Sequence, residues 1–151
     1  MHRSCCFFIP RILLVAAVAG LGGCAYFNTY YNASVAFDGA RKLQLKTDTT
    51  GTDSSVHLTP QISAGYDTAI AKSLKVLQNY QRSTRWHDDA VFLIARSLFY
   101  KGKYQRAQRR LRQVLEEYPQ SPYVPETYLY LGKAYLYDDN LAKADETFAF
   151  V

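Results

Sequence analysis

Cysteine and serine side chains are the obvious candidates for nucleophilic chemistry in this chain, and their distribution argues against it. All three cysteines, Cys5, Cys6 and Cys24, lie in the first 24 of 151 residues. The rest of the chain therefore offers no partner for an internal disulfide and no thiolate ligand for a metal. Serine and threonine are plentiful, but the G-x-S-x-G turn that exposes the nucleophile of many hydrolases is missing from the sequence.

The run His87-Asp88-Asp89 is the place where metal binding or acid–base chemistry could be built. Three consecutive residues at a helix start cannot all point at one atom, and further ligands are missing. The alternative is that the two carboxylates serve the positive N-terminal end of a helix. We expect this second role, and with it no enzyme activity, no metal, no cofactor and no small-molecule substrate.

The charge balance gives no sign of a nucleic-acid partner. The chain has 18 basic and 13 acidic residues, for a net charge of +5. Arg3 and Arg11 belong to an N-terminal segment without acidic residues, and without residues 1–23 the net charge falls to +3. Such a balance is too mild to predict nucleic-acid binding. The 13 tyrosines, against a single tryptophan, indicate many half-buried rings that pack between elements.

The first 23 residues have the order of features found in a secretory signal peptide. Arg3 and Arg11 provide positive charge, residues 12–21 carry no charge, and two small glycines precede Cys24. The uncharged run is shorter than the roughly 20 apolar residues that a bilayer-spanning helix needs. Residues 1–23 are therefore predicted to be a targeting segment.

The end of this segment, Leu21-Gly22-Gly23-Cys24, resembles the lipobox of bacterial lipoproteins. The resemblance implies that residues 1–23 are cleaved and that Cys24 becomes the first residue, with lipid on its sulfur and usually on its amine. Several acyl chains hold a protein to a membrane far better than one. Ala25, in place of the aspartate that retains such proteins in the inner membrane, implies the periplasmic face of the outer membrane. The alternatives are secretion after cleavage elsewhere and an uncleaved signal anchor.

From residue 66 onward the sequence repeats itself every 37 or 38 residues. The recurring positions of the first two copies are Tyr66, Ala69, Val76, Leu77 and Tyr80, then Tyr104, Ala107, Val114, Leu115 and Tyr118. This spacing is typical of helices with one buried face. A second set of equivalents between them implies two helices per repeat. Gly102 and the prolines from Pro119 to Pro125 mark the predicted breaks between helices.

Two segments, YKGKYQRAQRRLRQVLEEYP and YLGKAYLYDDNLAKADETF, resemble the tetratricopeptide repeat. The resemblance implies an all-α solenoid of antiparallel helix pairs over residues 24–151. Small residues stand at Ala107 and Ala144, where two helices are expected to cross closely. The chain departs from the family pattern at Ala95, which replaces a glycine, and at Ser73, which replaces a large residue.

The resemblance is weak over residues 26–65. There we expect a first helix, packed on a helix at 62–80, and a mobile inserted loop at 46–61. The apolar stripe of that first helix is expected to include Phe27, Tyr30, Ser34, Phe37 and Ala40 or Arg41. By repeat phase, the chain stops inside its last helix, with Phe148 and Val151 uncovered, so we expect either further repeats beyond Val151 or a partner that covers this end.

The resemblance also implies a partner-binding groove along the first helix of each repeat. Its expected residues are Asp89, Phe92, Arg96, Phe99, Glu126, Leu129, Lys133 and Tyr137. Apolar residues interspersed with charge suit an extended or helical peptide; the alternative is that Phe92, Phe99 and Leu129 only pack against neighbouring repeats. A basic run, Lys101, Lys103, Arg106, Arg109, Arg110 and Arg112, is expected to be either a solvated helix face or a contact with anionic headgroups or an acidic partner.

Enlarged repeats behind a lipoprotein leader resemble the BamD-like lipoproteins of the β-barrel assembly machinery and the related Tol-Pal coordinating protein. The resemblance implies a membrane-anchored interaction module in the periplasm that assists assembly of outer-membrane β-barrel proteins. The alternative is a structural tether or scaffold in Tol-Pal or peptidoglycan-linked maintenance of the envelope. The expected partners are envelope proteins or their peptide segments, together with the membrane through lipid on Cys24.

Overall fold

A computed structural model describes residues 28–48, 58–80 and 86–151. Within these ranges the regular structure is entirely helical and no strand occurs, which confirms the predicted all-α class. The predicted signal peptide, Cys24, and residues 49–57 lie outside the described residues. None of the helices described in these ranges is long and apolar enough to cross a membrane.

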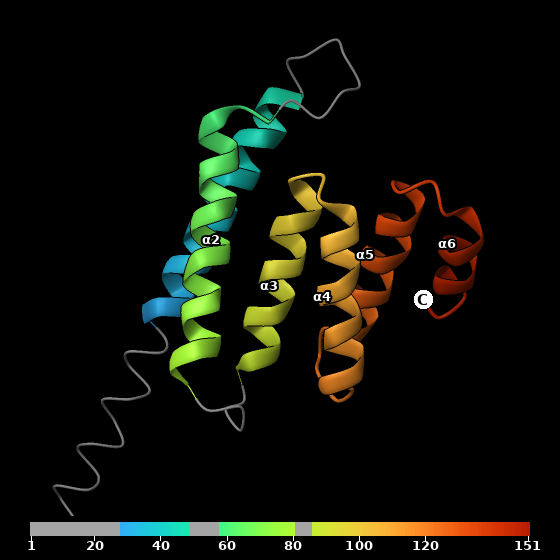
Figure 1. The fold of residues 1–151 in the computed structure, drawn as a ribbon. Coiled ribbons are helices and arrows are strands. Elements are labelled where there is room, and N and C mark those ends of the chain that lie inside the picture. The colour runs from blue at the N-terminus through green and yellow to red at the C-terminus, as the bar shows by residue number, and fades with distance from the viewer. Residues whose placement is uncertain (1–27, 49–57, 81–85) are drawn as a thin grey trace, which may run out of the picture.

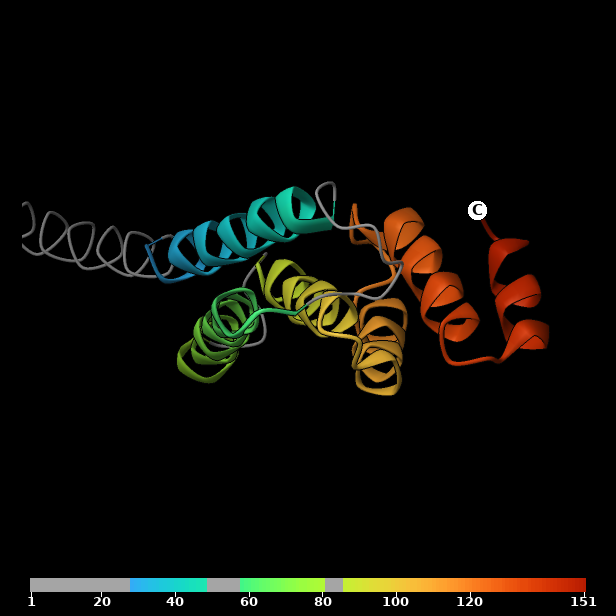
Figure 2. The ribbon, with the colours of Figure 1, turned by 90° about the horizontal axis from the view of Figure 1, so that it is seen from above.

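A helix over residues 28–48 precedes five others along the chain. Their bounds are α2 Pro60–Asn79, α3 His87–Tyr100, α4 Tyr104–Glu117, α5 Val124–Leu136 and α6 Leu141–Phe148. Each helix from α2 to α5 packs on the next one in the chain, and α3 also contacts α5 (Figure 1). Seen from above, the 28–48 helix, α3 and α5 lie along one side of the molecule, and α2 and α4 along the other (Figure 2). The arrangement is that of helix pairs stacked side by side.

The turns between helices follow from particular residues. Gly102 has a positive φ of 68°, a conformation that glycine adopts at little cost, and it separates α3 from α4 as predicted. Thr59 caps α2 by accepting a hydrogen bond from the amide of Ile62 at 3.3 Å, and Pro60 follows at the first helical position. Asn140 caps α6 in the same way through the amide of Lys143. These caps fix where the helices begin.

Two predicted boundaries change. The 28–48 helix runs into the expected 46–61 loop, and α2 begins at Pro60 rather than at 62, so both ends of that loop are helical. The reason is local, because the cap at Thr59 starts α2 two residues early. At the other end, α6 stops at Phe148 and does not include Val151. Phe148 is half-buried against the core, while Val151 is exposed.

The core runs through the stack as two main clusters. The 28–48 helix packs on α2, as predicted, and also on α3, through Ala33, Phe37 and Ala40 against Tyr66 and Leu93. The larger cluster joins α3, α4, α5 and α6 and holds the small residues at the crossings. Its fully or almost fully buried members include Ala95, Ala107, Leu111, Val114, Ala134 and Ala144. The predicted close crossings at Ala107 and Ala144 are therefore confirmed.

Candidate partner-binding site

The eight predicted groove residues fall on α3 and at α5 with its C-terminal cap, two helices that contact each other in one layer of the stack. The rings of Phe99 and Tyr137 lie with their centres 5.8 Å apart. The guanidinium of Arg96 lies 5.6 Å from the centre of the Tyr130 ring. The structure thus brings the α3 and α5 sets side by side, although they are one repeat of 37 or 38 residues apart in sequence.

Two of the predicted groove residues belong to the core instead of the surface. Phe92 is 2% exposed and Phe99 is 9% exposed, and both are part of the cluster that joins α3 to α5. For these two rings the alternative of packing between repeats is the correct one. The physical reason is that α5 and the loop before it come close enough to cover them. Leu129 is half-buried, so only part of its surface is open to a partner.

Arg96 holds the centre of this face. Its guanidinium lies 4.7 Å from the ring centre of Phe37 and 5.6 Å from that of Phe92, in addition to its contact with Tyr130. Cation–π contacts of this kind contribute about 0.5–2 kcal/mol each. The Nε of Arg96 is buried without a hydrogen-bond partner. A buried donor without a partner lowers the stability of the fold, and it is out of reach of a ligand in this conformation.

The exposed members of the predicted groove lie on α5 and just after it. Lys133 is exposed, with its ammonium 6.0 Å from the ring centre of Tyr130. Tyr137 is 59% exposed and stacks on Tyr104 at 5.2 Å. Glu126 is exposed near the N-terminal end of α5. These three side chains are the ones that a partner could reach without rearrangement of the core.

Asp88 and Asp89 connect two repeats. The hydroxyl of Ser121 donates to Asp88 at 2.6 Å, and the hydroxyl of Tyr123 donates to Asp89 at 2.5 Å. The Tyr123 ring stacks on Phe92 at 4.8 Å. Burial and the adjacent Asp89 carboxylate raise the pKa of Tyr123 above its usual value. Both acids lie in the first turn of α3, as predicted, and Asp89 holds the α4–α5 loop in place.

His87 shares neither of these contacts. Its side chain is 1% exposed, and both ring nitrogens lack a hydrogen-bond partner. In the described part of the chain, no group of three or more histidine, cysteine, aspartate or glutamate residues is placed to hold a metal ion. The His87-Asp88-Asp89 run is thus divided between the core and the α4–α5 loop.

Sequence reasoning missed two tyrosines of α3 and α5 that meet on this face, and an arginine of the 28–48 helix beside them. The hydroxyls of Tyr100 and Tyr130 are hydrogen-bonded at 2.8 Å, and Arg41 lies 4.2 Å from the ring centre of Tyr100. Burial, followed by the hydrogen bond with Tyr100, raises the pKa of Tyr130 to about 12. The high tyrosine content was the signal in the sequence, but it did not indicate which rings would meet.

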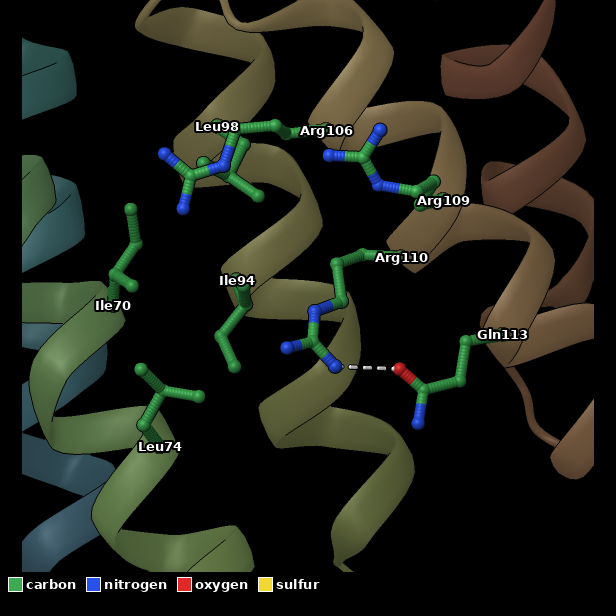
Figure 3. A pocket seen from close by; sticks show the side chains of 8 residues that line it. All are labelled: Ile70, Leu74, Ile94, Leu98, Arg106, Arg109, Arg110 and Gln113. Atoms are coloured by element: carbon green, nitrogen blue, oxygen red, sulfur yellow. Dashed lines mark hydrogen bonds between the residues drawn. The ribbon is translucent and has the colours of Figure 1, made fainter.

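The basic run divides between several surfaces. Lys101 forms an ion pair with Asp67 at 2.6 Å, and Arg112 donates to the hydroxyl of Tyr135 at 2.9 Å. Arg106, Arg109 and Arg110 instead line a separate hollow between α2 and α4 (Figure 3). The sequence could not separate these roles, because they depend on which neighbouring helix each side chain meets.

One comparison with known proteins agrees with this architecture. No curated protein and no solved structure matches the chain significantly. The family model of the tetratricopeptide repeat matches residues 89–121, which cover nearly all of α3, all of α4 and the turn after it. The helix pair of α3 and α4 is therefore similar to a tetratricopeptide repeat, which agrees with the all-helical architecture of the described residues.

Proposed function

We propose that this chain is a protein–protein interaction module that binds a peptide segment of a partner protein along the face formed by α3 and α5. The observation that carries the proposal is the position of the Arg96 guanidinium, which lies among the rings of Phe37, Phe92 and Tyr130 at the centre of this face. Lys133 and Tyr137 are exposed beside it. Concave faces of helix-pair solenoids are extended enough to hold a peptide along several repeats.

The chemistry of the face favours a segment with both apolar side chains and acceptor groups. Half-buried Leu129 and exposed Tyr137 offer apolar surface, and Arg96 with Lys133 offers positive charge. Tetratricopeptide repeats are typically scaffolds without catalytic activity. We therefore propose binding without turnover of a substrate.

The test uses a photo-crosslinking amino acid at Lys133 in cells, with the same amino acid at exposed Lys75 on α2 as the control. A partner captured from Lys133 but not from Lys75 is then tested against Lys133→Glu and Tyr137→Ser. We expect each exposed change to weaken binding about tenfold while the helical circular dichroism stays unchanged. Equal capture from both positions, or unchanged affinity of both variants, would contradict the proposal. Arg96 is less suitable for this test because it packs on three rings.

We propose further that the chain is anchored to the periplasmic face of the outer membrane by lipid on Cys24. The support is the lipobox-like Leu21-Gly22-Gly23-Cys24, which follows a leader with basic residues at its start and an uncharged run at 12–21. Mass spectrometry of the mature N-terminus tests this directly. An acylated Cys24 is the expected result, and an intact Met1 would refute both cleavage and lipidation.

Within the envelope, we propose a role in the assembly of outer-membrane β-barrel proteins, on the resemblance of leader and repeats to BamD-like lipoproteins. The other candidate is a tether or scaffold in Tol-Pal or peptidoglycan-linked maintenance. The Lys133 crosslinks distinguish the two. Capture of barrel-assembly components supports the first role, whereas capture of wall-associated proteins overturns it in favour of the second.

A further inference from the structure

A hollow of about 390 Å³ lies between α2 and α4, over α3. Its apolar side is formed by Ile70 and Leu74 of α2 and by Ile94 and Leu98 of α3, and its polar side is formed by α4 (Figure 3). The α4 residues are Arg106, Arg109, Arg110 and Gln113. We call this surface the arginine hollow. Ile94 and Leu98 are each two residues from Arg96, about 200° around a helix, so the arginine hollow and the α3–α5 face lie on different sides of α3.

The arginine hollow has a regular geometry along its length. Ile70 and Leu74, Ile94 and Leu98, and Arg106 and Arg110 are each four residues apart on their helices, so each pair lies along one helix face. Ile94 and Leu98 are buried and form the floor, while Ile70 and Leu74 are half-buried at the edge. Figure 3 shows Arg106 and Arg110 extending from α4 towards these apolar side chains.

Among the described residues, no carboxylate lines the arginine hollow or forms an ion pair with its arginines. Arg110 donates to Oε1 of Gln113, a neutral group, at 2.7 Å. Asp67 is the acidic residue of α2, and it is paired with Lys101 in the one ion pair found among residues 28–48, 58–80 and 86–151. Glu116 and Glu117 lie at the C-terminal end of α4, beyond the residues that line the hollow, and Glu117 accepts a hydrogen bond from Nε2 of Gln113 at 3.2 Å. In the described part of the chain, the three guanidinium groups therefore lie beside apolar side chains without an ion-pair partner.

We propose that the arginine hollow binds an acidic amphipathic helix of a partner protein. Such a helix places apolar side chains, spaced by one turn, against half-buried Ile70 and Leu74, because Ile94 and Leu98 beneath them are almost fully buried. Its carboxylates then meet Arg106, Arg109 and Arg110, which suit bidentate contacts with carboxylates. The apolar lining favours this occupant over an anionic membrane. Lipid headgroups need only exposed cations, whereas a recess of this size also accepts inserted apolar side chains.

This surface is separate from the α3–α5 face, so the two proposals stand or fall independently. The probe is a labelled synthetic helix of about 15 residues with leucines one turn apart and flanking glutamates. A second peptide replaces every glutamate by lysine. Binding to the full chain in a neutral detergent is measured by fluorescence anisotropy. The acidic peptide is expected to bind and the basic peptide is not.

Two variants locate the binding. Arg106→Glu with Arg110→Glu is expected to weaken binding of the acidic peptide at least about tenfold. Leu74→Ser is expected to weaken it about fivefold through loss of apolar contact. Lys42→Glu with Lys143→Glu is the control, because both lysines are exposed and lie on other helices, outside the hollow. The control is expected to bind like the parent chain. Circular dichroism excludes unfolding, and Arg106→Ala with Arg110→Ala repeats the test without added acidic charge.

Three results would overturn the proposal. The first is equal binding of the acidic and basic peptides. The second is an equal loss of binding in the arginine variant and the lysine control. The third is binding of micelles that contain phosphatidylglycerol through Arg106 and Arg110 while the acidic peptide fails to bind, which would make the surface a headgroup site.

Discussion

Two buried serines show how the same residue type has opposite effects in this fold. Ser73 in α2 and Ser97 in α3 are both fully buried. The hydroxyl of Ser97 donates to the carbonyl of Leu93 at 2.8 Å, whereas the hydroxyl of Ser73 has no hydrogen-bond partner. A buried polar group without a partner costs about 1–3 kcal/mol. Ser73 also stands where the tetratricopeptide pattern has a large residue, so this position is a weak point of the repeat.

Replacing each serine by alanine separates the two cases. We expect Ser73→Ala to raise the free energy of unfolding by about 1 kcal/mol, because it removes a hydroxyl that loses its water on folding and gains no hydrogen bond in exchange. Ser97→Ala is expected to lower it by about 0.5–1 kcal/mol through loss of a hydrogen bond. Urea unfolding followed by circular dichroism measures both. A loss of stability in Ser73→Ala would show that its hydroxyl has a partner after all.

At the scale of helices, two glycines lie where the paired helices come closest to each other. A Cβ added at Gly65 of α2 would lie 2.8 Å from the Cβ of Ala40 and 3.4 Å from the carbonyl oxygen of Ala36, both in the 28–48 helix. One added at Gly132 of α5 would overlap the ring of Phe148 in α6. Glycine at these positions lets the paired helices approach closely.

Gly65 and Gly39 form a matched test of this close approach, because both lie in the same helix pair. Nothing lies within 4 Å of a Cβ at Gly39, so Gly39→Ala is expected to raise stability by about 0.5–1 kcal/mol through helix propensity. Gly65→Ala has the same propensity gain but forces two helices apart, which costs about 1–3 kcal/mol. We expect its melting temperature to fall. Equal stabilisation by both changes would mean that the pair can separate freely at Gly65.

At the scale of the whole molecule, aromatic rings connect all three helix pairs. Phe37 and Tyr66 contact Tyr100, and Tyr100 is hydrogen-bonded to Tyr130 on α5. Burial raises the pKa of Tyr30 and of Tyr130 to about 12 each, and it raises the pKa of Tyr66 as well. These rings stay neutral in the folded chain at pH values where they ionise in the unfolded chain.

This difference predicts alkaline destabilisation. The contribution of these tyrosines to stability is full below their unfolded pKa of about 10 and is lost as pH rises from there towards 12. We expect the melting temperature to fall by several degrees between about pH 9 and pH 11, at roughly 3 °C for each kcal/mol lost. Tyr130→Phe is expected to reduce the slope of this fall, while lysines ionise equally in both chains. An identical slope in the variant would contradict the assignment.

Much of the fold could be predicted because its signals are local in sequence. The spacing of apolar residues gave the helices of the repeats, and Gly102 marked the turn that the structure confirms. Small residues indicated the crossings at Ala107 and Ala144. Helix ends were less certain, since capping by Thr59 depends on a single side chain. The leader and Cys24 stay predictions from sequence alone.

Which side chains meet across repeats was decided only by the tertiary structure. Phe92 and Phe99 were candidates for the surface, but α5 and the loop before it bury them. Arg96 packs on Phe37 of the 28–48 helix, two helices earlier in the chain. The basic run looked like one feature, yet Arg112 faces Tyr135 while Arg106 and Arg110 face an apolar floor. The periodicity of a helix fixes which of its residues share a face, whereas the neighbour of that face depends on how separate helices stack.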